Sequence, residues 1–241
     1  MGTEEGSMSN EKVLITGGNK GIGLATTKEF LSHGYKVYVV ARDFSKFNLD
    51  GKEQVEKIEF DLVNVAEIPH LAKKIGEINI LINNAGIMHG ISYEDYTEEK
   101  KDEILKVNLE APVALILAFS PGMVRQGKGR IVNNASIAGE IGHPDIWYGI
   151  TKAGVINFTK SFAKILGPKG IVINAVAPGP VETEMLQVIP KERKEGMKRI
   201  AYTGRYATAE EIAKTIYWLA TDCPDYINGT CIDINNGVFP R

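Results

Sequence analysis

The sequence predicts an α/β fold in which helices cover both faces of one doubly wound, seven-stranded parallel sheet. Two patterns predict it: short apolar segments alternate with longer amphipathic ones, and a glycine-rich turn joins the first strand to the first helix. The 241 residues contain no repeat or clear linker, so one domain is expected at residues 8–241. A second methionine, Met8, indicates that residues 1–7 are an expression remnant.

The expected strands are short apolar runs bounded by glycine, proline or charged residues. In chain order they are Lys12–Thr16, Lys36–Ala41, Lys57–Asp61, Asn79–Asn83, Gly129–Ala135, Gly170–Ala177 and Thr230–Asp233. The most continuous of these runs are typical of strands that are buried on both faces, as in a parallel sheet.

Helices are expected between these strands, at Leu24–His33, Val65–Ile75, Glu98–Arg125, Asp145–Leu166 and Thr208–Thr221. The first should end near Gly34, and the last begins with a Thr208/Glu211 capping box. Pro112 should kink or break the third helix. The segment 185–206 is charged and irregular, and we expect a mobile helical flap over a site there.

Composition excludes several classes of protein. The chain is 44% hydrophobic and 24% charged with a net charge of −2, so it has no general basic field for nucleic acid. No apolar run approaches the ~20 residues of a membrane span, and no signal peptide is visible, so a cytoplasmic protein without membrane partner is expected. Cys223 and Cys231 show no metal-like spacing. Free thiols and no metal site are expected.

The glycine turn at residues 17–23 has the features of a phosphate site. It follows a buried strand and opens a helix, where backbone N–H groups and the helix dipole favour a pyrophosphate. Its spacing, Gly17-x-x-x-Gly21-x-Gly23, differs from the usual Gly-x-Gly-x-x-Gly fingerprint. The setting therefore indicates dinucleotide binding more than the spacing does.

Residues after the second strand bear on the choice between two dinucleotides. Asp43 lies about 20 residues past the glycines, where an acid binds the ribose 2′-hydroxyl of NAD. Arg42 is closer to the strand end, and Lys20 in the glycine turn could reach the same position; both suit a 2′-phosphate. Two charge-assisted contacts of ~1.5–3 kcal/mol each would favour NADP at least tenfold. NADP(H) is therefore expected over NAD(H).

The chemistry is expected at Ser136, Tyr148 and Lys152. Residues four apart share a helix face, so Tyr148 and Lys152 should point the same way. A free phenol has a pKa near ~10 and a neighbouring cation lowers it. Reaching ~7 requires roughly 4 kcal/mol, which an ammonium and a bound cofactor's positive ring could supply. Ser136, at a strand end, would then hydrogen-bond a substrate carbonyl.

Together these motifs resemble the short-chain dehydrogenase/reductase family, classical type, from about Lys12 to the C-terminus. The motifs that carry the resemblance are Thr16-Gly17-x-x-x-Gly21-x-Gly23, Asn83-Asn84-Ala85-Gly86, Ser136, Tyr148-x-x-x-Lys152 and Pro178-Gly179. The resemblance implies a single Rossmann domain and a hydride-transfer enzyme. The pair Asn133-Asn134 departs from the family pattern and puts the pocket floor in doubt.

The resemblance also implies a role for each matched residue. Tyr148 would be the general acid-base, Lys152 would bind the nicotinamide ribose, and Asn108 would hold a water in a proton relay. Asp61 would contact adenine and Thr183 the nicotinamide carboxamide. The implied cofactor-binding residues are Gly17, Asn19, Lys20, Gly21, Ile22, Gly23, Arg42, Asp61, Leu62, Asn84, Ala85, Gly86, Tyr148, Lys152, Pro178, Gly179, Val181 and Thr183.

The expected function is reversible hydride transfer between NADP(H) and a carbonyl or secondary alcohol. Three alternatives remain open: a 3-oxoacyl-thioester reductase of the acyl-carrier type, a sugar or polyol dehydrogenase, and a non-catalytic NADP(H)-binding regulator. A basic cluster at Arg125, Lys128 and Arg130 could meet an acidic carrier protein, although a solvated turn is preferred. By family resemblance, a homotetramer or homodimer is expected.

Overall fold

The computed structural model describes residues 11–49, 53–184, 186 and 191–240, and the expected remnant at 1–7 lies outside them. Seven parallel strands form one sheet in the order β3-β2-β1-β4-β5-β6-β7. They are β1 Lys12–Thr16, β2 Lys36–Ala41, β3 Val55–Glu59, β4 Ile80–Asn83, β5 Gly129–Asn134, β6 Ile171–Pro178 and β7 Cys231–Ile234. The predicted fold class is confirmed.

The strand order reverses between β1 and β4, the two strands at the middle of the sheet. The connections that follow β1 and β4 therefore run in opposite directions from the carboxyl ends of these two strands, and a crevice opens between them. The glycine turn follows β1, and the Asn84-Ala85-Gly86 segment follows β4. Both predicted cofactor segments consequently lie at this crevice.

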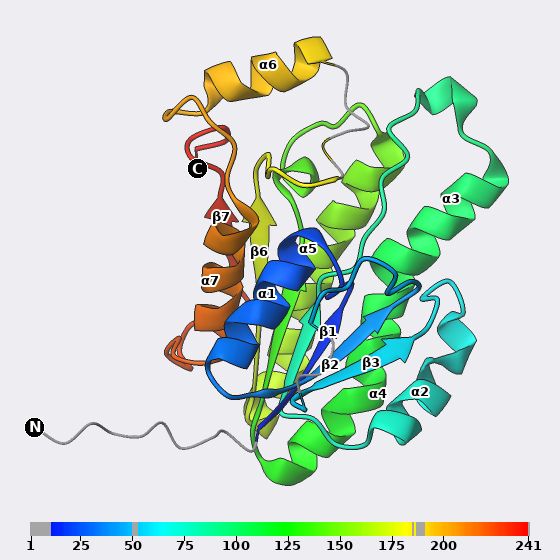
Figure 1. The fold of residues 1–241 in the computed structure, drawn as a ribbon, viewed down its shortest axis with the longest axis vertical. Coiled ribbons are helices and arrows are strands. Elements are labelled where there is room, and N and C mark those ends of the chain that lie inside the picture. Colours follow the sequence, from blue (N-terminus) through cyan, green and yellow to red (C-terminus); the bar gives the residue numbers. More distant parts are fainter. Residues whose placement is uncertain (1–10, 50–52, 185, 187–190, 241) are drawn as a thin grey trace, which may run out of the picture.

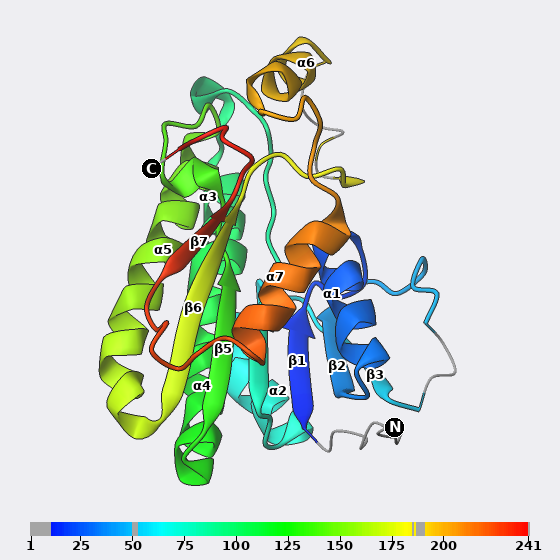
Figure 2. The same cartoon turned by 90° about the vertical axis from the view of Figure 1, so that its left-hand side faces the viewer.

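The helices of the fold are α1 Gly21–Ser32, α2 Ile68–Ile75, α3 Glu98–Leu105, α4 Ala111–Gln126, α5 Ile146–Leu166, α6 Lys191–Ile200 and α7 Ala209–Ala220. Helices α1 and α7 cover one face of the sheet, and α2, α4 and α5 cover the other (Figures 1 and 2). Each face buries its own apolar cluster, one around Phe30 and Ile212 and one around Leu115 and Ile173. Burial on both faces explains why the strands are so apolar.

Boundaries differ from the expected ones where tertiary pairing decides them. Helix α1 starts at Gly21, inside the glycine turn, and not at Leu24. Strand β3 starts at Val55 because it pairs with β2 from that residue, and it ends before Asp61. The capping box of α7 is confirmed: Thr208 accepts from the Glu211 backbone and the Glu211 side chain accepts from Thr208.

The expected break at Pro112 takes the form of one π-helical turn, Lys106–Glu110, between α3 and α4. Pro112 is the second residue of α4, directly after this turn, and it cannot donate a backbone hydrogen bond to the preceding turn. The combined helix Glu98–Gln126 is long and apolar enough to cross a membrane, which the sequence analysis did not expect. About half of its apolar window, 56%, is buried inside the domain, as in a core helix.

The segment expected to form a flap contains α6, which lies beyond the carboxyl edge of the sheet (Figure 1). Residues 185 and 187–190 of that segment lie outside the described residues. Helix α6 is held near its start by Arg193, which bonds His143, and by the Lys194 carbonyl, which accepts from Tyr206. The described part of the segment is thus helical over Lys191–Ile200; that it forms a mobile flap stays a prediction.

Candidate active site

The glycine turn forms a cradle that only glycine permits. Gly17 and Gly21 have positive φ angles, +64° and +52°. A Cβ on Gly23 would lie 2.0 Å from the Gly17 carbonyl oxygen and 2.5 Å from the Asn84 amide nitrogen. Lys20, the residue that precedes the helix, makes no side-chain cap. The first N–H groups of α1 therefore remain available to an anion, as a dinucleotide pyrophosphate requires.

Two polar side chains tie the cradle to the end of β4. The Thr16 hydroxyl accepts from the backbone N–H of Asn84 and of Ala85, both at 3.0 Å. The Asn84 amide donates to the carbonyls of Thr16 and Gly17 at 3.0 and 3.3 Å. Asn84 therefore joins the end of β4 to the end of β1 and to the glycine turn. Thr16 was named only as part of a motif, and no pattern in the sequence showed its role.

The cations expected at the ribose phosphate are exposed and held in weak ion pairs. Lys20 lies 3.5 Å from Glu184, and Arg42 lies 3.7 Å from Glu103. Asn19 donates to the Asp43 carbonyl at 2.7 Å and so joins the glycine turn to the end of β2. The Asp43 carboxylate accepts from the backbone and hydroxyl of Ser45, which lowers its pKa. The Asp43 carboxylate is therefore already hydrogen-bonded within the turn formed by residues 43–45.

The other expected cofactor residues surround the same edge. Asp61 accepts from the Val63 backbone at 3.1 Å, and Leu62 is buried beside it. Thr183 lies above Gly21, at 3.4 Å from where a Cβ would stand. Pro178 is the last residue of β6, and the Gly179 N–H donates to the Ile234 carbonyl. Val181 forms an isolated β-bridge with Ala207. Ile22 packs against the apolar cluster under α1. These residues lie at or just past the carboxyl ends of β3 and β6 or beside the glycine turn. Their contact with a dinucleotide stays a prediction.

Tyr148 and Lys152 lie on one face of α5, as the helical spacing predicts. The ammonium is 5.6 Å from the centre of the phenol ring. Ser136 hydrogen-bonds the Tyr148 side chain. Lys152 donates to the Asn134 carbonyl at 2.7 Å, and this bond fixes the ammonium under the end of β5. Three groups from two elements therefore converge at the crevice.

The ionisation of the phenol differs from the sequence-based expectation. Burial raises the pKa of Tyr148 to about 12, and Asp145 adds to the rise, although the Ser136 hydrogen bond lowers it. Burial also lowers the pKa of Lys152 to about 8. Both side chains are nearly inaccessible, 9% and 4% exposed, so desolvation outweighs their mutual attraction. In the protein without a bound ligand, the Tyr148 phenol therefore keeps its proton at neutral pH.

Asn108 stands in the π-helical turn, which explains a buried asparagine in mid-helix. Its side chain exchanges two hydrogen bonds with the Ile87 backbone, both 2.8 Å, and donates to Thr151 at 3.2 Å. A cavity of about 10 Å³ adjoins it, lined in part by Asn83, Asn134 and Lys152. That volume is close to the minimum that one water molecule needs.

Several residues at the site were missed or misjudged from sequence. Asp145 caps α5 by accepting from the Tyr148 N–H, and it also accepts from the Tyr96 hydroxyl. Its Asp-before-helix position was the available signal. Asn133 does not reach a pocket floor; it is fully buried and donates to Thr159. Its neighbour Asn134 serves the site through the carbonyl that holds Lys152.

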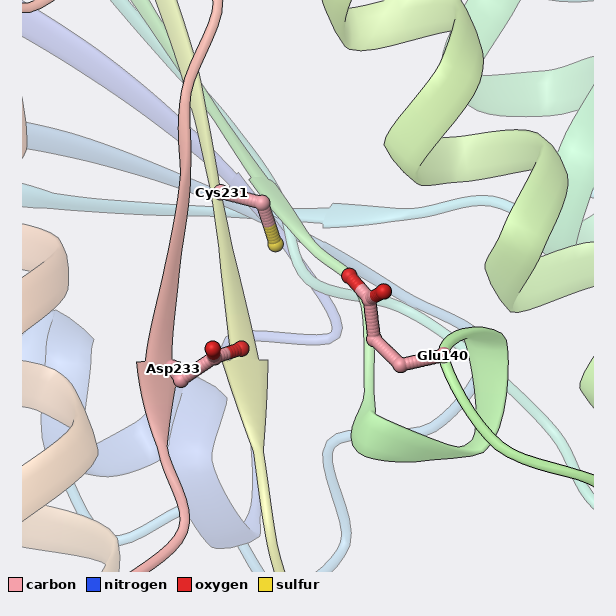
Figure 3. Close-up of side chains that lie close together, drawn as sticks. All are labelled: Glu140, Cys231 and Asp233. Atoms are coloured by element: carbon pink, nitrogen blue, oxygen red, sulfur yellow. The ribbon is translucent and has the colours of Figure 1, made fainter. Parts of the chain in front are cut away.

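One group of possible metal ligands also forms near this edge. Figure 3 shows Glu140, after the turn that follows β5, pointing toward Cys231 and Asp233 of β7. Their ligand atoms lie within 4.8 Å of one another. Cys231 and Asp233 share a strand face, but no sequence spacing brings in Glu140. Such groups also occur without an ion, so the absence of a metal site stays a prediction.

A model of the short chain dehydrogenase family matches residues 11–194. The chain belongs to the short-chain dehydrogenase/reductase family. The matched segment includes the glycine cradle, Ser136, Tyr148 and Lys152. The resemblance drawn from the motifs is therefore confirmed.

Two relatives in this family match nearly the whole chain. The 3-oxoacyl-[acyl-carrier-protein] reductase of Thermotoga maritima is 38% identical over 239 residues, which cover 93% of this chain and 96% of the relative. The enzyme of the same name from Aquifex aeolicus is 34% identical over 238 residues, covering 94% and 96%.

Solved structures agree with the fold. A provisionally assigned NAD(P)-dependent gluconate 5-dehydrogenase from Beutenbergia cavernae, with NADP bound, superposes with a TM-score of 0.90 at 27% identity, covering 96% of this chain and 98% of that one. A provisionally assigned 2-deoxy-D-gluconate 3-dehydrogenase from Agrobacterium tumefaciens, also with NADP, gives 0.87 at 28% identity, covering 99% and 100%. This short-chain dehydrogenase/reductase is an NAD(P)-dependent oxidoreductase that acts on carbonyl or alcohol groups.

Proposed function

We propose that the protein catalyses reversible hydride transfer between NADP(H) and a carbonyl or secondary alcohol, with Ser136, Tyr148, Lys152 and Asn108 as the catalytic set. The observation that carries the proposal is a buried phenol, hydrogen-bonded to Ser136, with the Lys152 ammonium one helical turn along the same face. A purely structural tyrosine gains nothing from a buried cation, which is costly to desolvate.

Each residue has a task in the reaction. NADPH, when bound, supplies the hydride. Ser136 orients the substrate oxygen by hydrogen bonding, and Tyr148 donates its proton to that oxygen. Because burial raises the pKa of the Tyr148 phenol to about 12, the phenol is protonated at neutral pH and can act as the general acid. The oxidation direction needs the phenolate, so it should be favoured as the pH rises.

A proton relay completes the proposed mechanism. The small cavity behind Lys152 is lined by Asn108 and Asn134. The Asn134 side-chain oxygen there is buried and has no hydrogen-bond partner among the described residues, so it suits a bridging water. Such a water would accept a hydrogen bond from Lys152. It would pass a proton inward, to restore the Tyr148 phenol, after each reduction, and outward after each oxidation.

The preference for NADP(H) rests on the charges near the end of β2. The turn formed with Ser45 occupies the Asp43 carboxylate, the one group that argued for NAD. Lys20, Arg42 and Lys46 carry exposed cations in the same region, in ion pairs longer than 3.4 Å. Exposed pairs contribute little to stability, so a 2′-phosphate can replace their acidic partners at small cost.

The first candidate substrate is a 3-oxoacyl thioester, because relatives covering 93–94% of the chain are named reductases of that class. The basic cluster considered for carrier docking does not favour it. Arg125, Lys128 and Arg130 pair with Glu77, Glu11 and Asp225 at 2.9, 3.0 and 2.6 Å. A sugar or sugar-acid substrate is the second candidate, supported by the two gluconate-type structures.

We also propose an oligomer, a homotetramer or homodimer, in the cytoplasm. Three apolar side chains on the outer sides of α4 and α5 support the oligomer: Leu117, Ile150 and Ile165 are 60%, 51% and 57% exposed. Light scattering coupled to size exclusion tests it, and a monomer at micromolar concentration would refute it.

The direct test of function follows NADPH absorbance with a panel of 3-oxoacyl thioesters, sugar acids, polyols and simple ketones. Turnover with at least one class is expected, with NADPH used in preference to NADH. Tight NADPH binding without turnover of any class would instead support the non-catalytic regulator.

A further inference from the structure

Helix α6 brings one arginine into the catalytic neighbourhood. Arg193 donates to the His143 Nε2 at 3.1 Å, and the His143 ring lies 5.3 Å, centre to centre, from the Tyr148 ring. One imidazole therefore separates the guanidinium from the catalytic phenol. Both Arg193 and His143 are half-buried, so this contact lies inside the site and not on the outer surface.

The imidazole in this contact is neutral. Arginine can only donate, so His143 Nε2 accepts from Arg193; Nδ1 lies 3.1 Å from the Asp145 carbonyl oxygen and 3.2 Å from the Asp145 backbone nitrogen. Burial lowers the pKa of His143, and Arg193 lowers it further. His143 thus orients the guanidinium without cancelling its charge.

Arg193 also differs from most other described arginines in having no acidic partner in the described part of the chain. Arg42, Arg125, Arg130 and Arg205 each lie within 4.0 Å of a carboxylate. The buried carboxylate of Asp145 already accepts hydrogen bonds at both oxygens. Oδ1 accepts from the Tyr96 hydroxyl and the Tyr148 N–H, and Oδ2 accepts from the Gly90 N–H. Within the described residues, the half-buried Arg193 guanidinium donates to His143 and meets no carboxylate, which suits it to an incoming anion.

We propose that Arg193 selects an anionic substrate, by binding a carboxylate or phosphate that the substrate carries a few bonds from the carbonyl protonated by Tyr148. The proposal rests on the proposed oxidoreductase function and narrows its substrate class. A guanidinium binds either anion through two parallel hydrogen bonds, which fixes the orientation of the substrate as well as its charge. A long neutral acyl chain offers Arg193 no such partner.

The experiment compares kcat/KM for substrates that differ only in charge. One arm uses pyruvate, acetoacetate and levulinate, each against its methyl ester; the other uses dihydroxyacetone phosphate against dihydroxyacetone. Wild type, Arg193→Gln and Arg193→Lys are assayed with NADPH. Arg199→Gln, an exposed arginine on the same helix, is the matched control.

We expect the wild type to favour the charged member of at least one pair by tenfold or more. Arg193→Gln should lose at least tenfold on that member, mostly through KM, and less than twofold on its neutral partner. Arg193→Lys should retain part of the preference, and Arg199→Gln all of it. If the loss in Arg193→Gln appears with the keto acids, the bound anion is a carboxylate; if it appears with dihydroxyacetone phosphate, the anion is a phosphate.

Two results would overturn the inference while leaving the proposed function intact. One is turnover of neutral substrates with no preference for charge in any pair. The other is an equal loss on charged and neutral members in Arg193→Gln, which would assign Arg193 a purely structural role. Absence of turnover with every substrate in both arms and in the broader panel would refute the proposed function, and the inference with it.

Discussion

The two ends of the proposed cofactor site, the catalytic end and the ribose-phosphate end, are built differently. At the catalytic end, Tyr148 and Lys152 are buried, and Ser136 and the Asn134 carbonyl hold them by hydrogen bonds. At the ribose-phosphate end, Lys20 and Arg42 are 67% and 57% exposed and meet their acidic partners at 3.5 and 3.7 Å. The fold thus fixes the groups proposed to do chemistry, whereas the groups proposed to select the cofactor are exposed and held in long ion pairs.

This difference has an energetic reason. A proton donor must be in place before the substrate arrives, because misplacing it by about 1 Å can cost ~10²-fold in rate. A selectivity contact needs only to form with the ligand, and an exposed ion pair of roughly 0–1 kcal/mol is easily replaced. Mutations at the catalytic end should therefore have large effects on turnover, and mutations at the ribose-phosphate end should have smaller effects on cofactor selectivity.

The largest effect is expected at the catalytic end. Tyr148→Phe removes the proton donor and keeps the ring, so kcat should fall by ~10²–10⁴-fold. Cofactor affinity, measured by NADPH fluorescence titration, should change less than twofold. The same loss of affinity and of turnover would mean that Tyr148 binds the cofactor and does not do chemistry.

The second effect concerns the buried ammonium. Since burial lowers the pKa of Lys152 to about 8 from an ordinary value near 10.5, the unfolded state binds more protons between those pH values. The free energy of unfolding of the wild type should therefore rise with pH across that window, relative to Lys152→Met, by up to about 3 kcal/mol. Denaturant melts of both proteins at pH 7, 9 and 10.5 measure this difference. A constant difference would show that Lys152 is not desolvated.

The third effect tests the π-helical turn that supports the catalytic end. Asn108→Leu leaves the partly buried N–H and C=O of Ile87 without their partner, at up to about 1–3 kcal/mol for each group. Urea unfolding should show that loss, whereas Asn157→Leu, an exposed change on α5, should cost less than about 0.5 kcal/mol. Equal costs would remove the structural account of Asn108.

The smallest effect is expected at the ribose-phosphate end. Arg42→Asp should lower the NADP-to-NAD ratio of kcat/KM by about tenfold or more, because it replaces an attraction for the 2′-phosphate by a repulsion. Folding should be unaffected, since only a weak exposed pair is lost. Arg125→Asp, an equally exposed arginine paired with Glu77, is the control. An unchanged ratio in Arg42→Asp would remove Arg42 from cofactor selection.

The fold and the shared helix face of Tyr148 and Lys152 were predictable because they depend on local pattern. The alternation of apolar segments predicts the sheet, and the four-residue spacing places Tyr148 and Lys152 on one face of α5. The start of β3 at Val55 was not predictable, because that edge strand carries exposed polar residues and is defined by its pairing with β2.

The electrostatics of the site could not be read from the sequence for a related reason. Spacing shows that a cation lies near Tyr148, but the cost of burying both groups depends on the helices packed around them. The position of Arg193 is a similar case, because its contact with His143 joins residues far apart in the chain. Patterns report neighbours along the chain, whereas desolvation and such contacts are set by the whole fold.

The central claim is that Tyr148 is a buried acid that keeps its proton at neutral pH in the free protein. Ultraviolet titration of tyrosinate in wild type and in Tyr148→Phe isolates this one phenol by difference. The account predicts no difference step below about pH 10, because burial raises the pKa of Tyr148 to about 12. A step near pH 7 would contradict it and show that Lys152 alone makes the phenol easy to ionise.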